Sequence, residues 1–232
     1  MTAPASPRDR VLQRLELVCQ ELGPALISEV TLVGGSLQAV LPLEVPNRPT
    51  KDVDFILPTP TASSWHRFLR AMEDRGFKAS SDEDAPVCRY EKSVSAIKLV
   101  VDVMPTDGRL GFSNRWYTDA HAHRQETSIP GLFGATPLHY LLTKIEAYTD
   151  RGAKDPLSSH DLEDIITLCR GLPALLDEVQ AGSSPAHVAA RTFLRSLASR
   201  RDSRALIEAH TEGTSSAQHG AAALLIRLSA LP

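Results

Sequence analysis

The most constraining feature of this chain is a glycine turn followed, after a proline-bearing linker, by two closely spaced acidic residues. Gly34 and Gly35 precede Ser36, and glycines let backbone N–H groups approach phosphate oxygens while the serine adds a hydroxyl donor. Asp52 and Asp54 are two residues apart, so on a strand both carboxylates point to the same face. Such carboxylates repel each other unless a cation lies between them, and magnesium prefers oxygen ligands. The pattern predicts a site for a nucleoside triphosphate and its magnesium.

A third acidic residue follows on a later expected strand. The segment 97–104 is an apolar, β-branched run that ends before Pro105, which is a strand signal. Its Asp102 joins Asp52 and Asp54 if the two strands are neighbours in one sheet. Three carboxylates on adjacent strands can hold two metal ions in line for phosphoryl chemistry. Each piece alone is more often a plain turn or a solvated strand end, so the prediction depends on all of them occurring together.

The glycine turn, the Asp52-x-Asp54 pair and Asp102 resemble the nucleotidyltransferase superfamily that includes DNA polymerase beta. The lead-in Arg48-x-Thr50-x-Asp52-x-Asp54 is more narrowly similar to the AbiEii-type and MenT-type nucleotidyltransferase toxins of bacterial toxin–antitoxin systems. This resemblance implies magnesium, or manganese in its place, bound by the three aspartates. It also implies an NTP substrate whose nucleoside monophosphate passes to a hydroxyl acceptor. Asp102 would complete a second metal site or act as the base for that hydroxyl.

The composition fits an ordinary globular protein. The chain has 232 residues, of which 42% are hydrophobic and 23% charged, with a net charge of −3 and a pI of about 6.2. This balance argues against a globally basic nucleic-acid coat protein, but it permits a local basic groove. Three widely spaced cysteines lack zinc spacing and favour reduced core thiols. We expect no secretory signal, no membrane span and a cytoplasmic location.

The periodicity predicts an α+β fold in two domains. Residues 8–135 are expected to form a nucleotidyltransferase catalytic domain with a mixed β-sheet and flanking helices. Residues 136–232 are expected to form an α-helical domain that contributes to the nucleotide and acceptor sites. The predicted helices lie over 8–22, 65–75, 137–148, 161–170, 175–180, 185–199, 203–210 and 221–231, and a helix begins over 37–41. The predicted strands lie before residue 34 and over 53–57, 77–79, 87–92 and 96–104, and a flexible connector covers 212–220.

A second group of charged residues lies on the expected helices. Lys144 has apolar neighbours, and Asp161 and Asp164 share a helix face farther along. By resemblance to the AbiEii-type pattern, Lys144 would contact phosphates and Asp161 would be the motif aspartate of the nucleotide site. His160 stands where that family commonly has arginine. Lys144 as a snorkelling helix lysine and Asp161 as a first-turn acid are the plain alternatives.

The acceptor is less constrained than the metal motif. An amphipathic basic helix over 185–204 suggests a phosphate-tracking patch for RNA, although a solvated face is its plain alternative. An aromatic and basic loop, Arg109 with residues 115–117, could stack a base. By resemblance, the acceptor is the 3′ end of a tRNA or a protein hydroxyl, and a cognate antitoxin is a partner.

Two other functions stay open. A small-molecule nucleotidyltransferase, such as an aminoglycoside-modifying enzyme, would need an acidic acceptor pocket, which residues 82–84 could supply. A non-catalytic nucleotide-sensing or antitoxin-binding module would bind NTP and magnesium without transfer.

Overall fold

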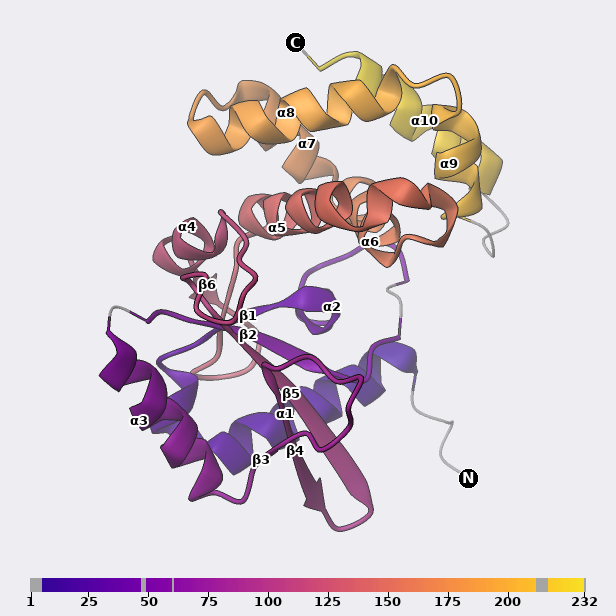
Figure 1. Ribbon diagram of the computed structural model, residues 1–232. Helices are drawn as coiled ribbons and strands as arrows, with labels where there is room; N and C mark the ends of the chain where they lie inside the picture. The colour runs from indigo at the N-terminus through magenta and orange to yellow at the C-terminus, as the bar shows by residue number, and fades with distance from the viewer. Residues whose placement is uncertain (1–5, 47–48, 60, 212–216, 232) are drawn as a thin grey trace, which may run out of the picture. The chain divides into compact units, whose positions relative to one another are not determined.

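The computed structural model describes residues 6–46, 49–59, 61–211 and 217–231. Arg48, part of the motif discussed above, lies outside these residues. The chain forms two compact units, one made of residues 1–41 and 47–136, the other of 42–46 and 137–232. Figure 1 shows the mixed sheet in the first unit and the helices of the second. The predicted α+β class is confirmed.

The first unit contains a mixed sheet of seven strands in the order β3-β4-β5-β2-β1-β7-β6. Its centre is formed by β2 and β5, which are parallel neighbours, while β1 and β4 flank them as antiparallel neighbours. Both central strands are mostly buried apolar runs, as expected of strands inside a sheet. The strands are β1 (Thr31–Val33), β2 (Val53–Leu57), β3 (Lys78–Ala79), β4 (Arg89–Val94), β5 (Ile97–Pro105), β6 (Gln125–Glu126) and β7 (Phe133–Gly134).

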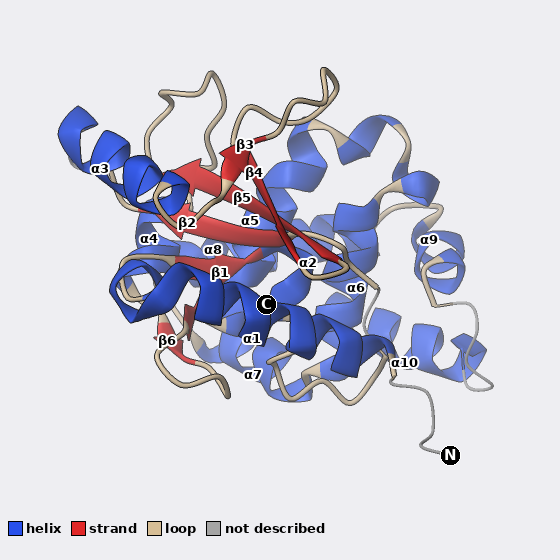
Figure 2. Ribbon diagram, turned by 90° about the horizontal axis from the view of Figure 1, so that it is seen from below, coloured by secondary structure: helices blue, strands red, loops and turns tan. Residues whose placement is uncertain are grey.

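Four helices accompany this sheet: α1 (Pro7–Ile27), α2 (Gly34–Leu37), α3 (Ala62–Glu73) and α4 (Tyr117–Ala122). An apolar stripe on α1, which includes Val11, Leu15 and Val18, is fully buried. Figure 2 shows α1 crossing one side of the sheet, and α3 packs beside α1. The helix bends where Gly23 adopts φ +73° before Pro24, which is where the sequence predicts its first segment to end.

A half-buried histidine, His121, links α4 to the sheet. His121 Nδ1 lies 2.9 Å from the hydroxyl of the fully buried Thr31 on β1. Burial, and next the nearby Arg124, lower the pKa of His121 to about 4. The imidazole is therefore neutral at physiological pH and serves the packing of α4.

The second unit is helical. Its α-helices are α5 (Pro137–Asp150), α6 (His160–Gly171), α7 (Pro173–Ala181), α8 (Pro185–Ala198), α9 (Ser203–Ala209) and α10 (Ala217–Ser229), with short 3₁₀ turns at Gly152–Lys154 and Pro156–Ser158. The predicted cap of α6 is present, because Ser159 Oγ accepts a hydrogen bond from Leu162 N. Within this unit α5 packs against both α6 and α8 (Figure 1). In the described part of the chain, no helix combines the length and the apolar character needed to cross a membrane.

Two local expectations were wrong. The sequence predicts a helix over 37–41, but α2 is a single turn that ends at Leu37, and 38–40 continue as turns. Pro42 keeps any helix from continuing past residue 41, because the residue before a proline disfavours the helical conformation. The sequence also predicts a connector over 212–220, but α10 begins at Ala217, while 212–216 lie outside the described residues. The short elements α4, β6 and β7 had no clear periodic signal.

Candidate active site

A row of four residues crosses the centre of the sheet. Val33 on β1 is paired in register with Asp54 on β2, and Asp54 is paired with Asp102 on β5. Asp102 is paired in turn with Arg89 on β4. Residues in register on neighbouring strands present their side chains to the same face of a sheet. The topology therefore brings two of the three predicted carboxylates together on adjacent strands, and it adds an arginine beside them.

Gly34 directly follows Val33 in the sequence. Because it has no side chain, it leaves room for the Asp54 carboxylate. Its φ is +64°, a left-handed conformation that favours glycine. A Cβ atom built on Gly34 would lie 1.9 Å from Asp54 Oδ2 and 2.4 Å from its Cγ. Any side chain at this position would collide with the carboxylate. The first glycine of the turn is therefore required both by backbone conformation and by the close approach of Asp54.

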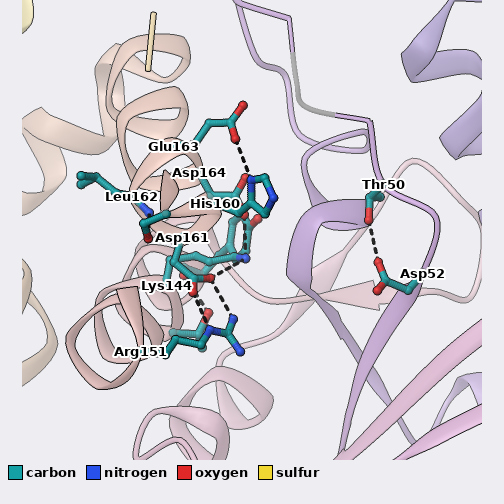
Figure 3. Close-up of polar contacts among 12 residues, drawn as sticks. Thr50, Asp52, Lys144, Arg151, His160, Asp161, Leu162, Glu163 and Asp164 are labelled. Carbon is teal, nitrogen blue, oxygen red and sulfur yellow. Dashed lines mark hydrogen bonds and ion pairs between the residues drawn. The ribbon is translucent and has the colours of Figure 1, made fainter. Parts of the chain in front are cut away.

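Three side chains fix the segment around Asp52 just before β2. The Ser36 hydroxyl, which is fully buried, donates to the Asp52 carbonyl oxygen at 2.6 Å. Thr50 Oγ1 donates to Asp52 Oδ1 at 2.7 Å, as Figure 3 shows. Arg14 Nη1 on α1 donates to the Thr50 carbonyl at 2.7 Å. Thr50 thus holds the Asp52 carboxylate and Ser36 holds the Asp52 backbone, and this use of the Ser36 hydroxyl was not predicted.

Arg89 neutralises part of the carboxylate cluster. Its Nε and Nη2 donate to the two oxygens of Asp102 at 2.8 and 2.7 Å, and Nη2 also donates to Asp52 Oδ2 at 3.1 Å. The side chains of Asp102 and Arg89 are 8% and 24% exposed, so water screens this pair only partly. Hydrogen bonding to Asp102 raises the pKa of Arg89, which stays charged at all accessible pH. Arg89 therefore joins Asp102 to Asp52, and Asp54 is the register partner of Asp102 on the next strand.

The sequence interpretation missed Arg89. In its segment 87–92 the arginine looks like a solvated residue of a partly exposed strand. The signal that could have revealed it is the hairpin turn, because Val94 pairs with Ile97 and the antiparallel register then places Arg89 opposite Asp102.

The donor chemistry at this cluster fits magnesium. Asp52, Asp54 and Asp102 offer carboxylate oxygens, and magnesium is commonly bound through one or two carboxylates together with substrate phosphates. As placed in the described residues, no group of three or more His, Cys, Asp or Glu side chains is arranged to hold a metal ion. The carboxylates of Asp52 and Asp102 both pair with Arg89 instead. The residues therefore fit an ion bound by two carboxylates better than one enclosed by protein ligands alone.

Cys88 lies beside the cluster but is not a nucleophile. The side chain is buried, and burial, with the nearby Asp102 as the next cause, raises the pKa of its thiol to about 12. A thiol with such a pKa stays protonated at neutral pH and is inert. The other two cysteines, Cys19 and Cys169, are also free thiols with raised pKa values, near 11 and 12, because of burial. This arrangement agrees with the prediction that the cysteines are reduced thiols in the core.

In the second unit, a compact ion-pair cluster surrounds Lys144 on α5. Its Nζ lies 2.6 Å from Asp164 Oδ2 and 3.2 Å from Asp161 Oδ1, both on α6. Arg151 donates from Nε and Nη2 to the two oxygens of Asp161 at 2.8 and 3.1 Å. Figure 3 shows these four side chains together. The structure thus brings Lys144, Asp161 and Asp164 into one cluster, with Arg151 at its exposed edge.

The charges in this cluster are held by one another. Burial opposes the charge on Lys144, but Tyr140 and then Asp164 and Asp161 outweigh it and raise the pKa of the ammonium. Burial likewise opposes the charge on Asp161, yet the Arg151 hydrogen bonds and Lys144 lower the pKa of that carboxyl. The lysine side chain is 11% exposed. It is a buried, permanently charged group with a carboxylate on two sides rather than a snorkelling lysine.

One of the two arginines of α8, the helix expected to bind RNA, has a structural role. Arg191 Nη1 donates to the carbonyl oxygens of Val179, Gln180 and Gly182 at 2.8, 3.2 and 3.0 Å. These carbonyls belong to the end of α7, where backbone oxygens lack helical partners. Farther along, Arg200 and Arg204 pair with Asp202 and Glu208. Arg191 is thus a structural cap, and the segment is less available to phosphates than its sequence suggests.

The aromatic and basic loop is also largely engaged. Arg109 pairs with Asp107 and stacks over Trp65, with 5.6 Å between the guanidinium carbon and the ring centroid. The ring of Trp116 is buried and lies under Arg115. Trp116 therefore belongs to the core of the first unit.

Two solved structures share this architecture. JHP933 from Helicobacter pylori is 12% identical with a TM-score of 0.50, over 96% of this chain and 92% of the other. A chain described as a "putative nucleotidyltransferase from H. pylori" is 13% identical with a TM-score of 0.52, over 96% of this chain and 95% of the other. The chain has a nucleotidyltransferase-like fold. Identity this low shows the fold alone. No family model matches the chain, and no curated protein matches it in sequence.

Proposed function

We propose that this protein is a nucleotidyltransferase that moves a nucleoside monophosphate from an NTP to a hydroxyl acceptor. The observation that carries the proposal is the pairing of Asp54 with Asp102 on parallel neighbours, beside a glycine turn that leaves room for Asp54. Gly34 lies where β1 passes into α2, and its positive φ and lack of a side chain admit the Asp54 carboxylate to this turn. The nucleotidyltransferase-like fold supports the same reading.

The proposed roles follow from the contacts. Asp52 and Asp54, with Asp102 completing the site, would hold magnesium or manganese, which when bound supplies charge neutralisation at the transferred phosphoryl group. Gly34, Gly35 and Ser36 would face the triphosphate with the first N–H groups of α2, since the Ser36 hydroxyl is engaged with Asp52.

The remaining roles concern single protein groups. Asp102 accepts one hydrogen bond on each oxygen from Arg89, so each oxygen keeps a lone pair that can accept the proton of the acceptor hydroxyl. Lys144 would be a phosphate-binding lysine, and Asp161 would orient it, as the resemblance to AbiEii-type proteins implies. Positioning and charge complementarity are the main sources of catalysis in such transfers.

We further propose that the biological role is that of a toxin of the AbiEii and MenT type, acting on a tRNA or a protein. This rests on the Thr50-x-Asp52-x-Asp54 motif, whose threonine holds the Asp52 carboxylate. A cognate antitoxin would be its partner.

The test is a labelling assay with each α-labelled NTP, magnesium, and total cellular RNA or protein. Asp54→Asn removes a proposed metal ligand with little change in volume. Asp84→Asn is the matched control, because Asp84 is an exposed acid of the same unit in a surface turn. We expect label in RNA or protein with the wild type and Asp84→Asn, and none with Asp54→Asn.

Other outcomes separate the alternatives. Label in a small cationic acceptor alone would replace the toxin proposal by an antibiotic-modifying one. Stabilisation by NTP and magnesium with no transfer to any acceptor would leave a nucleotide-binding module. Equal labelling by Asp54→Asn and the wild type would show that the aspartate row is not the active site.

A further inference from the structure

Arg89 has a role beyond neutralising the charge of Asp102 on the neighbouring strand. The three aspartates of the first unit carry three negative charges within one small region, and like charges at short range repel one another. A guanidinium that bonds both oxygens of Asp102 and one oxygen of Asp52 offsets one of these charges. The two charges that remain match one divalent cation.

The placement of the guanidinium selects which carboxylates are left for that cation. Arg89 forms a two-bond fork with Asp102, which is the strongest geometry for an arginine and a carboxylate. The fork is set by the backbone, because Arg89 and Asp102 are register partners on β4 and β5. Asp54 lies on the other side of Asp102, and its carboxylate occupies the space that a side chain at Gly34 would fill. Asp52 lies just before β2, and its carboxylate accepts a hydrogen bond from Thr50 on one oxygen and from Arg89 on the other.

We propose that Arg89 is a positioning residue that stands in place of a second metal ion, so that the site binds one divalent cation through Asp52 and Asp54. This inference rests on the proposed function, because it concerns the metal site of that reaction. The guanidinium keeps a fixed positive charge beside Asp102, where a second cation would be repelled. Asp102 is then held as an oriented carboxylate rather than as a ligand shared by two metals.

A purely structural ion pair makes a different prediction. If Arg89 only stabilised the β4–β5 hairpin, its removal would lower stability and leave the number of bound cations unchanged. If it stands in place of a cation, its removal exposes Asp102 and adds a metal site. The count of bound cations separates these cases, and stability alone does not.

The experiment counts Mn²⁺ bound to the full chain by electron paramagnetic resonance, with Mn²⁺ alone as the probe. The variants are Arg89→Ala, Arg89→Gln, Arg89→Lys and Asp54→Asn. Lys98→Ala is the matched control, because Lys98 lies on the same hairpin and pairs with Glu91 away from the aspartates. Circular dichroism of each variant verifies folding.

We expect one bound Mn²⁺ per chain for the wild type, Lys98→Ala and Arg89→Lys, and a second for Arg89→Ala and Arg89→Gln. Two ions on the wild type would overturn the inference even if both neutral variants fail to fold. A single ion on folded Arg89→Ala or Arg89→Gln would also overturn it. Loss of binding in Asp54→Asn ties the counted ion to this site. If no variant binds Mn²⁺ the inference fails, whereas the labelling assay decides separately whether the protein transfers nucleotides.

Discussion

Replacing Gly34 with alanine tests how closely the glycine turn and Asp54 depend on each other. The new Cβ would lie 1.9 Å from Asp54 Oδ2, and contacts of Cβ atoms essentially never fall below 3.0 Å, so one group must move by at least 3.0 − 1.9 = 1.1 Å. A displacement of about 1 Å at a reacting group can cost roughly 100-fold in rate. The left-handed backbone at φ +64° adds a strain of about 1–2 kcal/mol for a residue with a side chain.

Gly131→Ala is the matched control for this prediction. Gly131 also has a left-handed backbone, with φ +78°, but a Cβ built there meets nothing within 4 Å. Both variants should lose about 1–2 kcal/mol of unfolding free energy through backbone strain. Only Gly34→Ala should also lose transfer by about 100-fold, together with Mn²⁺ binding.

The assays are denaturant unfolding followed by circular dichroism, and label transfer at saturating NTP. Wild-type transfer by a folded Gly34→Ala protein would refute the argument that the turn exists to admit Asp54. Equal losses of transfer in both alanine variants would show that backbone strain, rather than the collision, disables the protein.

Three further predictions concern charge and packing. Lys144→Met removes the ammonium from between the buried Asp161 and Asp164 and should cost about 3–5 kcal/mol of unfolding free energy, measured in urea; a loss below 1 kcal/mol would contradict the burial argument. Arg191→Ala frees the carbonyls at the end of α7 and should cost about 1–3 kcal/mol while transfer stays near the wild-type rate, so a selective loss of RNA labelling would restore the RNA-patch hypothesis. His121 has a pKa of about 4 in the folded protein, below its ordinary 6.5, so the unfolded chain takes up a proton on this residue first. The free energy of unfolding should therefore fall as the pH drops from 6.5 towards 4. His121→Gln should flatten this part of the curve of stability against pH. An unchanged slope would show that His121 is not buried as a neutral ring.

Much of the first unit could be predicted because its signals are local. The strand over 53–57 is bounded by prolines and polar residues, and β2 has those same bounds. The apolar run that contains Asp102 forms β5, and its parallel pairing with β2 places Asp54 and Asp102 in register. The sequence predicts that the aspartates meet if their strands are neighbours. In the structure these strands are neighbours.

The role of Arg89 could not be predicted in the same way. Its partners are fixed by the antiparallel register of β4 and β5, and that register depends on the turn at Ser95, which has φ +54°. A shift of one residue would have turned the arginine to the other face. The same limit applies to Ser36, because a hydroxyl in a phosphate-type turn gives no local sign that it will donate to a carbonyl sixteen residues away.

In the second unit the sequence indicated which charged residues form a group, but not that they are buried. Lys144, Asp161 and Asp164 were identified as one charged group, and the structure joins them. Their burial was not predicted, because hydrophobic periodicity cannot tell a lysine at the margin of an apolar face from one enclosed beneath it. Arg191 shows the reverse case, since a helix that looks basic in sequence has used its arginine to cap a neighbour.

We propose that the aspartates of the first unit direct attack at the α-phosphorus of an NTP. Parallel reactions with α-labelled and γ-labelled NTP, magnesium and cellular RNA or protein test this directly. We expect the acceptor to gain only the α label, the γ label to leave in pyrophosphate, and Asp54→Asn to abolish both events. A γ label on the acceptor, which would mean phosphoryl rather than nucleotidyl transfer, or transfer that persists in Asp54→Asn would contradict it.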